Sequence, residues 1–194
     1  MEISLRPAVK SDIPDLARLL QMAGGGLMDA IYHDLIPGQS VGETMEARFR
    51  NEASYNHFRY STVAVADGEI AGSVNLYALD DPVAHWTDPI VPETRRLVLQ
   101  PFGHLKPAGG LYVDFIAVYP GFRSKGVGRL LLAFAVSEAQ RKGLPLVHLH
   151  VFEQNEAAVR LYQSVGFDIA KSHPVIPHPM LAYGGNMVLM SCPV

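Results

Sequence analysis

The chain has 194 residues, of which 48% are hydrophobic and 18% are charged, and its formal net charge is -3 at pH 7. This composition is typical of a folded globular protein, and the weak net charge gives no basis for binding nucleic acid or an anionic membrane. The single cysteine, Cys192, excludes an internal disulfide and a multi-cysteine metal site. The sequence has neither a signal peptide nor an apolar run of about 20 residues, the length of a membrane span. We therefore expect a soluble cytoplasmic protein with one domain over residues 1–194.

The first 76 residues predict a short strand, three helices and a β-hairpin. Apolar residues at helical spacing follow a candidate N-cap at Ser11–Asp12. The dipeptide Asp67–Gly68 between two apolar runs is typical of a tight hairpin turn. The expected elements are a strand over 2–9, helices over 12–23, 27–36 and 40–49, and hairpin strands over 58–66 and 70–76.

The rest of the chain predicts alternating strands and helices after a long irregular segment. Five prolines interrupt an insert over 78–110, in which we expect one helix around 93–100. An irregular segment of this length is usually functional or disordered. Beyond it we expect strands over 111–118, 146–151, 167–170 and 187–190 and helices over 126–142 and 155–165. This order indicates an α/β fold with a mixed sheet of six to seven strands and with parallel crossovers in its second half.

The stretch GFRSKGVG, residues 121–128, joins an expected strand to an expected helix. Glycine permits a close backbone approach, and the first N–H groups of a helix have no internal acceptor, so an anion such as a phosphate fits there. Arg123 and Lys125 add positive charge beside it. A P-loop is excluded because Val127 stands where a lysine is needed, and the dinucleotide pattern fails because Leu131 replaces its last glycine. Taken alone, the stretch is equally well a glycine-rich turn without a ligand.

Three motifs in the right order resemble the core of the GNAT superfamily, the acyl-CoA-dependent N-acyltransferases. A strand ends in IAVYP at 116–120, and the family's R/Q-x-x-G-x-G/A turn matches residues 123–128. The pattern N-x-x-A-x-x-L-Y-x-x-x-G-F matches residues 155–167. The resemblance is sharp over 111–170 and looser but in the same order over 1–77.

No resemblance covers residues 78–110 or 172–186. Where it holds, it implies the GNAT fold, a mixed central sheet with flanking helices. That sheet splays between the strands at 111–118 and 146–151.

The resemblance implies that acyl-CoA, such as acetyl-CoA, is the donor. Its pyrophosphate is expected on the backbone N–H groups of the turn and its pantetheine along the preceding strand, where a backbone N–H would polarise the thioester carbonyl. Tyr162 matches the family's general acid, which would protonate the departing thiolate; its alternative role is packing on the sheet beside Val159 and Leu161. The implied cofactor-binding residues are Ile116, Ala117, Val118, Arg123, Ser124, Lys125, Gly126, Val127, Gly128, Arg129, Asn155 and Tyr162.

An amine acceptor needs a base, because a lysine-like amine with a pKa of about 10.4 is protonated at neutral pH. Asp114 is our first choice for this catalytic role, since it stands where many relatives carry a glutamate. His148 and His150, on the neighbouring expected strand, and Glu153 after it are alternatives. The two histidines share one strand face, but no third ligand has metal-site spacing, so we expect a buried or cleft-lining pair and no metal.

These residues predict an N-acetyltransferase that moves an acetyl or short acyl group from acyl-CoA to a primary amine of a small molecule or peptide. The alternative is a regulatory or sensor domain that binds acyl-CoA without turnover. We expect the insert over 78–110 and the proline-rich loop over 173–183 to frame the acceptor pocket. Within the insert, Trp86 is expected to anchor packing and Arg95 and Arg96 to form a solvated pair; the alternative for these residues is contact with an acceptor. Exposed strand edges near the C-terminus would allow a homodimer.

Overall fold

The computed structural model describes residues 2–194, and these form a mixed seven-stranded sheet in the order β1-β2-β3-β4-β5-β7-β6. Neighbouring strands are antiparallel except β4 and β5, which are parallel. The strands are β1 (Ile3–Pro7), β2 (Ser61–Ala66), β3 (Glu69–Ala78), β4 (Leu111–Val118), β5 (Leu146–Phe152), β6 (Asp168–Pro174) and β7 (Asn186–Pro193). The expected fold class is confirmed, although the second half holds one parallel pair because β6 and β7 return as an antiparallel pair.

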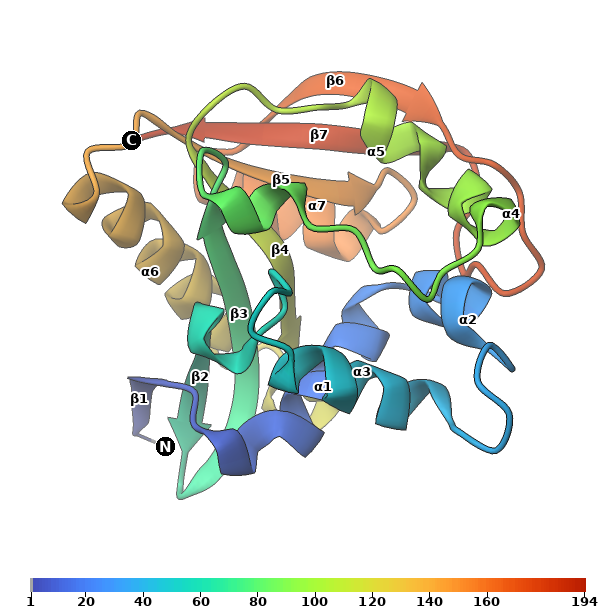
Figure 1. Ribbon diagram of the computed structural model, residues 1–194. Helices are drawn as coiled ribbons and strands as arrows, with labels where there is room; N and C mark the ends of the chain where they lie inside the picture. The colour runs from blue at the N-terminus through green and yellow to red at the C-terminus, as the bar shows by residue number, and fades with distance from the viewer. Residues whose placement is uncertain (1) are drawn as a thin grey trace.

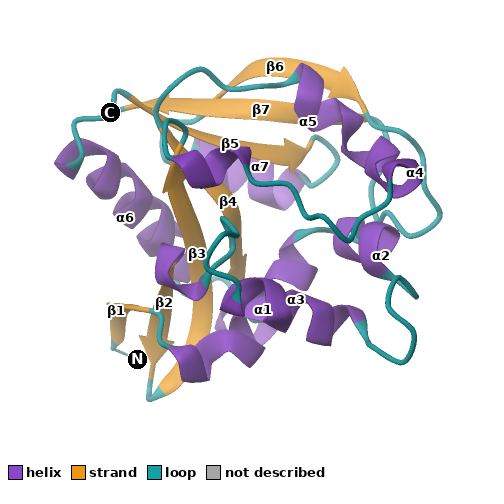
Figure 2. Cartoon of the chain, viewed as in Figure 1, coloured by secondary structure: helices purple, strands orange, loops and turns teal. Residues whose placement is uncertain are grey.

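Helices cover both faces of the sheet (Figures 1 and 2). One core cluster packs α6 and α7 against one face, and a second packs α1, α2 and α3 against the other. No helix within residues 2–194 is long and apolar enough to cross a membrane. The α-helices are α1 (Ile13–Ala23), α2 (Leu27–Tyr32), α3 (Val41–Arg50), α4 (Glu93–Arg96), α5 (Gln100–His104), α6 (Val127–Arg141) and α7 (Glu156–Gln163).

The N-terminal elements follow the predicted order, and three of them are clearly shorter, the first being β1, which covers Ile3–Pro7 and not 2–9. Helix α2 ends at Tyr32, before the predicted residue 36, because the chain turns at Asp34, which has a positive φ of 50°. Strand β2 begins at Ser61 and not at residue 58, since Phe58–Tyr60 form a 3-10 helix. The predicted hairpin is confirmed, and its turn at Asp67–Gly68 has φ values of 50° and 86°.

The last helices and strands also keep their predicted places. Gly126 and Asn155 are N-caps, so α6 and α7 each begin one residue after the predicted start. Asn155 Oδ1 accepts a hydrogen bond from the Ala158 N–H at 3.4 Å, as expected of a cap. Strands β6 and β7 are longer than predicted, which confines the loop between them to residues 175–185.

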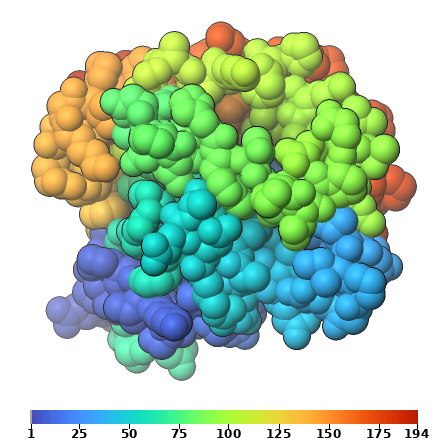
Figure 3. All heavy atoms as spheres, in the orientation of Figure 1, coloured from blue at the N-terminus to red at the C-terminus, as the bar shows by residue number. Residues whose placement is uncertain are grey.

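The insert contains more helix than the sequence predicts. The helix expected around 93–100 is divided into α4, a 3-10 turn at Leu97–Leu99 and α5, and a further 3-10 helix covers Pro82–His85. In Figure 3 the insert, in green, spreads over the front of the molecule between the segment around α3 and the C-terminal strands. The insert is therefore a cover over one side of the sheet and not a loop projecting from it.

The sheet opens between its two parallel strands. β4 and β5 pair only over Leu111–Val113 and Val147–Leu149. Beyond these residues β4 continues beside β3 as far as Val118, while β5 continues beside β7 as far as Phe152. Figure 1 shows the result: β1 to β4 run down the view, and β5, β7 and β6 run across it. The predicted splay is confirmed, and we call the opening between β4 and β5 the wedge.

Candidate active site

Asp114 stands at an irregularity in β4, where the strand parts from β5. In the pairing with β3, Val113 and Phe115 face consecutive residues, so Asp114 is one extra residue, as in a β-bulge. The extra residue reverses the side-chain alternation: Val113 and Ile116 both pack on the α6 side, and Phe115 packs on the α1 side. The bulge thus places the predicted base at the closed end of the wedge, where pairing with β5 stops.

Asp114 is partly buried and is held through Asn56. Asn56 Nδ2 donates a hydrogen bond to Asp114 Oδ2 at 2.6 Å, and Arg48 donates to Asn56 Oδ1 from Nη2 at 2.6 Å and from Nε at 3.1 Å. Burial raises the pKa of Asp114 to about 6, although the charge of Arg48 and the hydrogen bond from Asn56 act in the opposite direction. Such a carboxyl group is ionised at neutral pH and is more basic than an exposed aspartate, as a general base requires.

Arg48 and the insert residue Asp88 were not found by sequence reasoning. Arg48 Nη1 lies 2.7 Å from Asp88 Oδ2, and the two side chains are 8% and 9% exposed. The guanidinium lies over the Trp86 ring, 5.0 Å from its centroid, so Trp86 is the packing anchor that we expected. The available signal was helical spacing, because Arg48 falls on the buried stripe of α3 that carries Met45 and Phe49.

The expectation of a solvated pair at Arg95 and Arg96 is wrong. Arg95 Nη1 donates to the Ile31 carbonyl at 3.1 Å, and Arg96 Nη2 donates to the Asp88 carbonyl at 2.7 Å. Arg95 supplies a donor to a carbonyl at the end of α2, where a helix leaves its last carbonyls without partners. Arg96 adds a donor to the Asp88 carbonyl, which also accepts from the Val91 N–H at 3.3 Å. The hydrogen bond from Arg95 to Ile31 thereby joins the insert to α2.

The alternative bases are less well placed to accept a proton. His150 Nε2 lies 3.0 Å from the Leu105 carbonyl and Nδ1 lies 2.6 Å from the Tyr112 hydroxyl, so both of its nitrogens are engaged. Burial lowers the pKa of His150 to about 4. His148 is buried with Nδ1 2.8 Å from Ser191 Oγ, and Glu153 accepts from Asn186 Nδ2 at 2.8 Å. As expected, the two histidines form a buried or cleft-lining pair.

The edge of β4 that faces the wedge has backbone groups without a strand partner, although the Val118 carbonyl accepts a hydrogen bond from Arg123 Nε. The Tyr119 N–H donates to the Ala71 carbonyl at 2.9 Å, on the β3 side. Because successive residues in a strand turn their N–H and C=O groups to opposite edges, those of Val118 and Ile116 face the wedge, and those of Ala117 face β3. Of the three strand residues predicted to line the donor, Ile116 and Val118 thus turn backbone groups to the wedge, and the Ala117 side chain packs in the core on the α1 side of the sheet.

The glycine-rich turn presents a row of N–H groups without acceptors. Leu130 is the first residue of α6 whose N–H is bonded, to the Gly126 carbonyl at 3.0 Å. Within residues 2–194 no hydrogen bond uses the N–H groups of the preceding residues Ser124, Lys125, Gly126, Val127, Gly128 and Arg129. A Cβ added at Gly126 would meet no atom within 4 Å, so the space in front of the turn is open. These groups fit an anion such as a diphosphate, since each is a donor at a helix N-terminus.

The cationic side chains around the turn are engaged elsewhere. Arg123 Nε donates to the Val118 carbonyl at 3.2 Å, and Lys125 Nζ lies 5.5 Å from the centre of the Phe122 ring. Arg129 Nη2 donates to Ser164 Oγ at 3.0 Å and so joins α6 to the end of α7. The backbone of the turn is therefore already arranged for an anion, whereas these side chains would have to move to reach one.

Tyr162 packs in the core and keeps its hydroxyl without a partner among the described residues. Its ring is 7% exposed and lies in the core cluster, 6.2 Å from the Phe167 ring, as the packing role predicts. Its hydroxyl forms no hydrogen bond with any described residue, and burial raises its pKa above the ordinary value for tyrosine. The hydroxyl therefore keeps its proton at neutral pH and has no competing partner, as a general acid requires.

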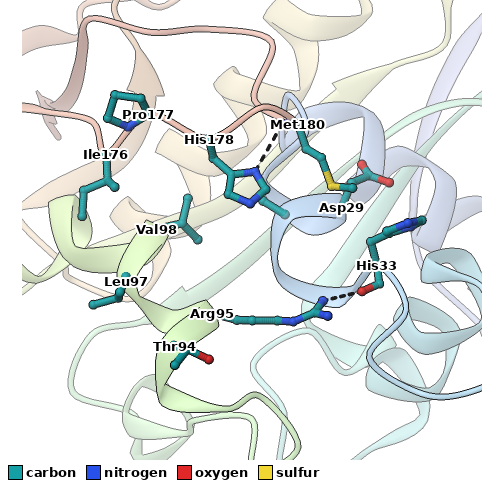
Figure 4. A pocket seen from close by; sticks show the side chains of 11 residues that line it. Asp29, His33, Thr94, Arg95, Leu97, Val98, Ile176, Pro177, His178 and Met180 are labelled. Carbon is teal, nitrogen blue, oxygen red and sulfur yellow. Dashed lines mark hydrogen bonds between the residues drawn. The ribbon is translucent and has the colours of Figure 1, made fainter.

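A pocket of about 420 Å³ lies between α2, α4 and the loop over 175–185 (Figure 4). Its charged or titratable lining residues include Asp29, His33, Arg95 and His178. The loop is tied to the turn before α2, because the Ala182 N–H donates to the Gly25 carbonyl at 2.9 Å. The pocket is thus lined by α2, the insert and the proline-rich loop, and its lining includes neither Asp114 nor Tyr162 nor any residue of β4 or β5.

Comparisons with known proteins agree with this arrangement. A mycothiol acetyltransferase of Nocardiopsis dassonvillei is 45% identical over 62 residues, 32% of this chain and 18% of that protein. A ribosomal protein bS18-alanine N-acetyltransferase of Salmonella typhimurium is 42% identical over 55 residues, 28% of this chain and 37% of that protein. The chain thus spans well under half the length of these curated relatives.

A solved protein of Salmonella typhimurium in complex with its cofactor acetyl-CoA has the same fold, with a TM-score of 0.60 at 18% identity over 100% of this chain and 94% of that one. The profile of the acetyltransferase (GNAT) family matches residues 28–167, which include the bulge, the wedge, the glycine-rich turn and Tyr162. The chain belongs to the acetyltransferase (GNAT) family.

Proposed function

We propose that this protein is an N-acetyltransferase that transfers an acetyl or short acyl group from acyl-CoA to a primary amine of a small molecule or peptide. The observation that carries the proposal is the placement of six unpaired N–H groups at residues 124–129 beside a wedge whose closed end holds Asp114. The N–H groups can bind a diphosphate, and Asp114 can accept a proton. Acetyl-CoA supplies both the diphosphate and an activated acyl group.

On the donor side, the chain offers backbone groups in two places. The turn over 124–129 would hold the diphosphate of coenzyme A, with Asn155 and Tyr162 on the other side of the donor. The backbone groups of Ile116 and the N–H of Val118 would hold the pantetheine as an added strand, and a free N–H there would stabilise charge that develops on the thioester oxygen.

On the acceptor side, Asp114 would remove a proton from the ammonium form of the amine. The amine nitrogen then forms a bond to the acyl carbon, the carbon–sulfur bond breaks, and the thiolate takes the proton of the Tyr162 hydroxyl. The nitrogen gives up its second proton as the amide forms, and that proton restores the Tyr162 hydroxyl. The raised pKa of Asp114 and the free hydroxyl of Tyr162 support these assignments.

The acceptor itself is proposed only as a class. The two curated relatives are named for different molecules, mycothiol in one case and the alanine of ribosomal protein bS18 in the other. The pocket between α2, α4 and residues 175–185 is lined in part by the insert, but Asp114 is not among its lining residues, so it does not identify the acceptor. A cytoplasmic location and a homodimer also stay predictions.

The proposal is tested by measuring both donor binding and turnover. Calorimetry with coenzyme A should show binding, and acetyl-CoA mixed with a panel of amines and peptides should release the free thiol of coenzyme A with at least one of them. Binding without turnover across the panel would favour the acyl-CoA sensor instead. No binding at a large excess of coenzyme A would reject both functions.

Tyr162→Phe separates the acid role from packing. The ring stays in the core and only the hydroxyl is lost, so we expect turnover to fall by about 10- to 100-fold while the affinity for coenzyme A changes little. Assays of thiol release measure the turnover, and calorimetry on the same preparations measures the affinity for coenzyme A. Equal turnover in the variant and the native protein would leave Tyr162 with a packing role alone.

A further inference from the structure

A continuous series of polar contacts joins the insert to Asp114. Asp88 Oδ2 lies 2.7 Å from Arg48 Nη1, Arg48 Nη2 donates to Asn56 Oδ1 at 2.6 Å, and Asn56 Nδ2 donates to Asp114 Oδ2 at 2.6 Å. These four residues, which we call the carboxylate relay, come from the insert, α3, the segment after α3, and β4. The relay thus connects a segment outside the family core to the proposed base.

The chemistry of the relay dictates the orientation of Asn56. Arg48 can only donate hydrogen bonds, so it faces the amide oxygen of Asn56 and leaves the amide nitrogen to face Asp114. Asn56 is 1% exposed, and its backbone N–H donates to Ser54 Oγ at 3.0 Å, which holds the residue in place. Oδ2 of Asp114 is therefore occupied, and Oδ1 forms no hydrogen bond with a described residue and is left for a substrate proton.

Arg48 has little freedom to rearrange. Its guanidinium lies 5.2 Å from the centroid of the Tyr32 ring, 5.6 Å from that of Tyr55 and 5.0 Å from that of Trp86. A buried ion pair is by itself weak evidence for stability, because desolvation offsets most of the attraction. What the enclosed guanidinium does contribute is a fixed positive charge one residue removed from Asp114.

We propose that Asp88, Arg48 and Asn56 are positioning residues for Asp114, through which the insert sets the free carboxylate oxygen toward the substrate and keeps the group ionised. The inference rests on the proposed function, since it gives Asp114 the role of the base. It assigns the insert a second task besides framing the acceptor pocket. The insert would bring Asp88 and Trp86 against Arg48, and without them Arg48 and Asn56 would lose their fixed geometry.

The other groups that face Asp114 are neutral at the working pH. Tyr55, Tyr77 and Tyr112 surround it, and burial raises the pKa of each tyrosine. Behind Tyr112, His150 is also neutral, because burial lowers its pKa to about 4. The charges that act on the Asp114 carboxylate through the relay are therefore those of Arg48 and Asp88.

The two ends of the relay should shift the titration of Asp114 in opposite directions. Asn56→Leu removes the hydrogen-bond donor to the carboxylate and should raise its midpoint by about one pH unit. Asp88→Asn keeps an oxygen for Arg48 but removes the negative charge, so the positive charge of Arg48 acts more strongly and the midpoint should fall by about half a pH unit. The measurement is carbon NMR of the full chain labelled at its aspartate carboxyl carbons. The Asp114 signal is the one missing from Asp114→Asn.

Asp15→Asn is the matched control, because it removes one aspartate charge at α1 that contacts Tyr119 and not the relay. It should leave the Asp114 midpoint unchanged. A residue with a purely structural role would not move the two midpoints in opposite directions, so midpoints that stay fixed, or that move the same way, overturn the inference. If Asn56→Leu does not fold, the fall expected in Asp88→Asn decides by itself.

The readout also separates the inference from the proposed function. Full turnover in Asp114→Asn would reject Asp114 as the base, and with it the positioning role, even if the midpoints move. Lost turnover in Asp114→Asn together with fixed midpoints would keep the base and reject the relay.

Discussion

The donor side and the acceptor side of the wedge are built in different ways. The donor turn over 124–129 is one short, continuous piece of chain that offers backbone N–H groups, and its geometry comes from a positive φ at Ser124 and Gly126. The acceptor side is a set of side chains from separate segments, in which Arg48, Asn56 and Asp88 surround Asp114. One side is local and made of backbone, and the other is long-range and made of side chains.

This difference predicts how each side responds to substitution. A backbone site loses binding when its φ and ψ angles change, and it is insensitive to which side chains the neighbouring residues carry. A side-chain network loses function when a single charge is removed, because its members depend on one another. Substitutions at the two sides should therefore separate binding from turnover.

Removal of the Asp114 charge should have the largest effect. In Asp114→Asn the base is lost with little change in shape, so turnover at pH 7 should fall by about 10²- to 10⁴-fold while the affinity for coenzyme A is kept. The variant should regain rate as the pH rises, since the amine then loses its proton to water without help. Thiol-release assays from pH 6 to 10 measure this. A native rate at pH 7 would show that the base lies elsewhere.

The donor side is tested by a change of backbone conformation. Gly126 has a φ of 85°, which alanine tolerates poorly, so Gly126→Ala should distort the N–H groups and weaken coenzyme A binding by about tenfold. Gly143→Ala is the matched control, because Gly143 lies just beyond the other end of α6 with a φ of 66° and equally open surroundings. Calorimetry on both variants measures the affinity. Equal weakening in the two would assign the effect to strain and not to the anion site.

The smallest expected effect is a gain in stability on the acceptor side. Burial raises the pKa of Asp114 from 3.8 to about 6, so the folded protein binds more protons than the unfolded chain between about pH 4 and pH 6. Stability from this group is present at pH 4 and is lost as the pH rises through 6. Asp114→Asn should therefore be more stable than the native protein at pH 7, by on the order of 1 kcal/mol.

Urea unfolding at pH 7 and at pH 4 measures that difference, which should shrink at the lower pH as the native carboxyl group becomes protonated. A variant that is less stable at pH 7 would mean that Asp114 serves the fold more than the reaction.

The predicted and observed elements agree where the residues of one short stretch determine its conformation by themselves. The hairpin at Asp67–Gly68 and the cap at Asn155 are examples, because the turn and the cap depend on neighbouring residues alone. Some errors have a local cause, such as the 3-10 turn that delays the start of β2, and others arise where a tertiary contact decides. Arg95 and Arg96 were predicted to be solvated, and the structure brings them against carbonyl groups that the sequence does not show to be near.

The candidate site divides along the same line. The glycine spacing over 121–128, the tyrosine at 162 and the aspartate at 114 are legible in the sequence, because family motifs record the local requirements of a turn, a helix and a strand. Arg48, Asn56 and Asp88 carry no motif, and they act only because α3, the segment after it and the insert meet at the bulge. Local chain geometry is encoded residue by residue, whereas the electrostatic surroundings of a buried carboxylate are a sum over segments that only folding brings together.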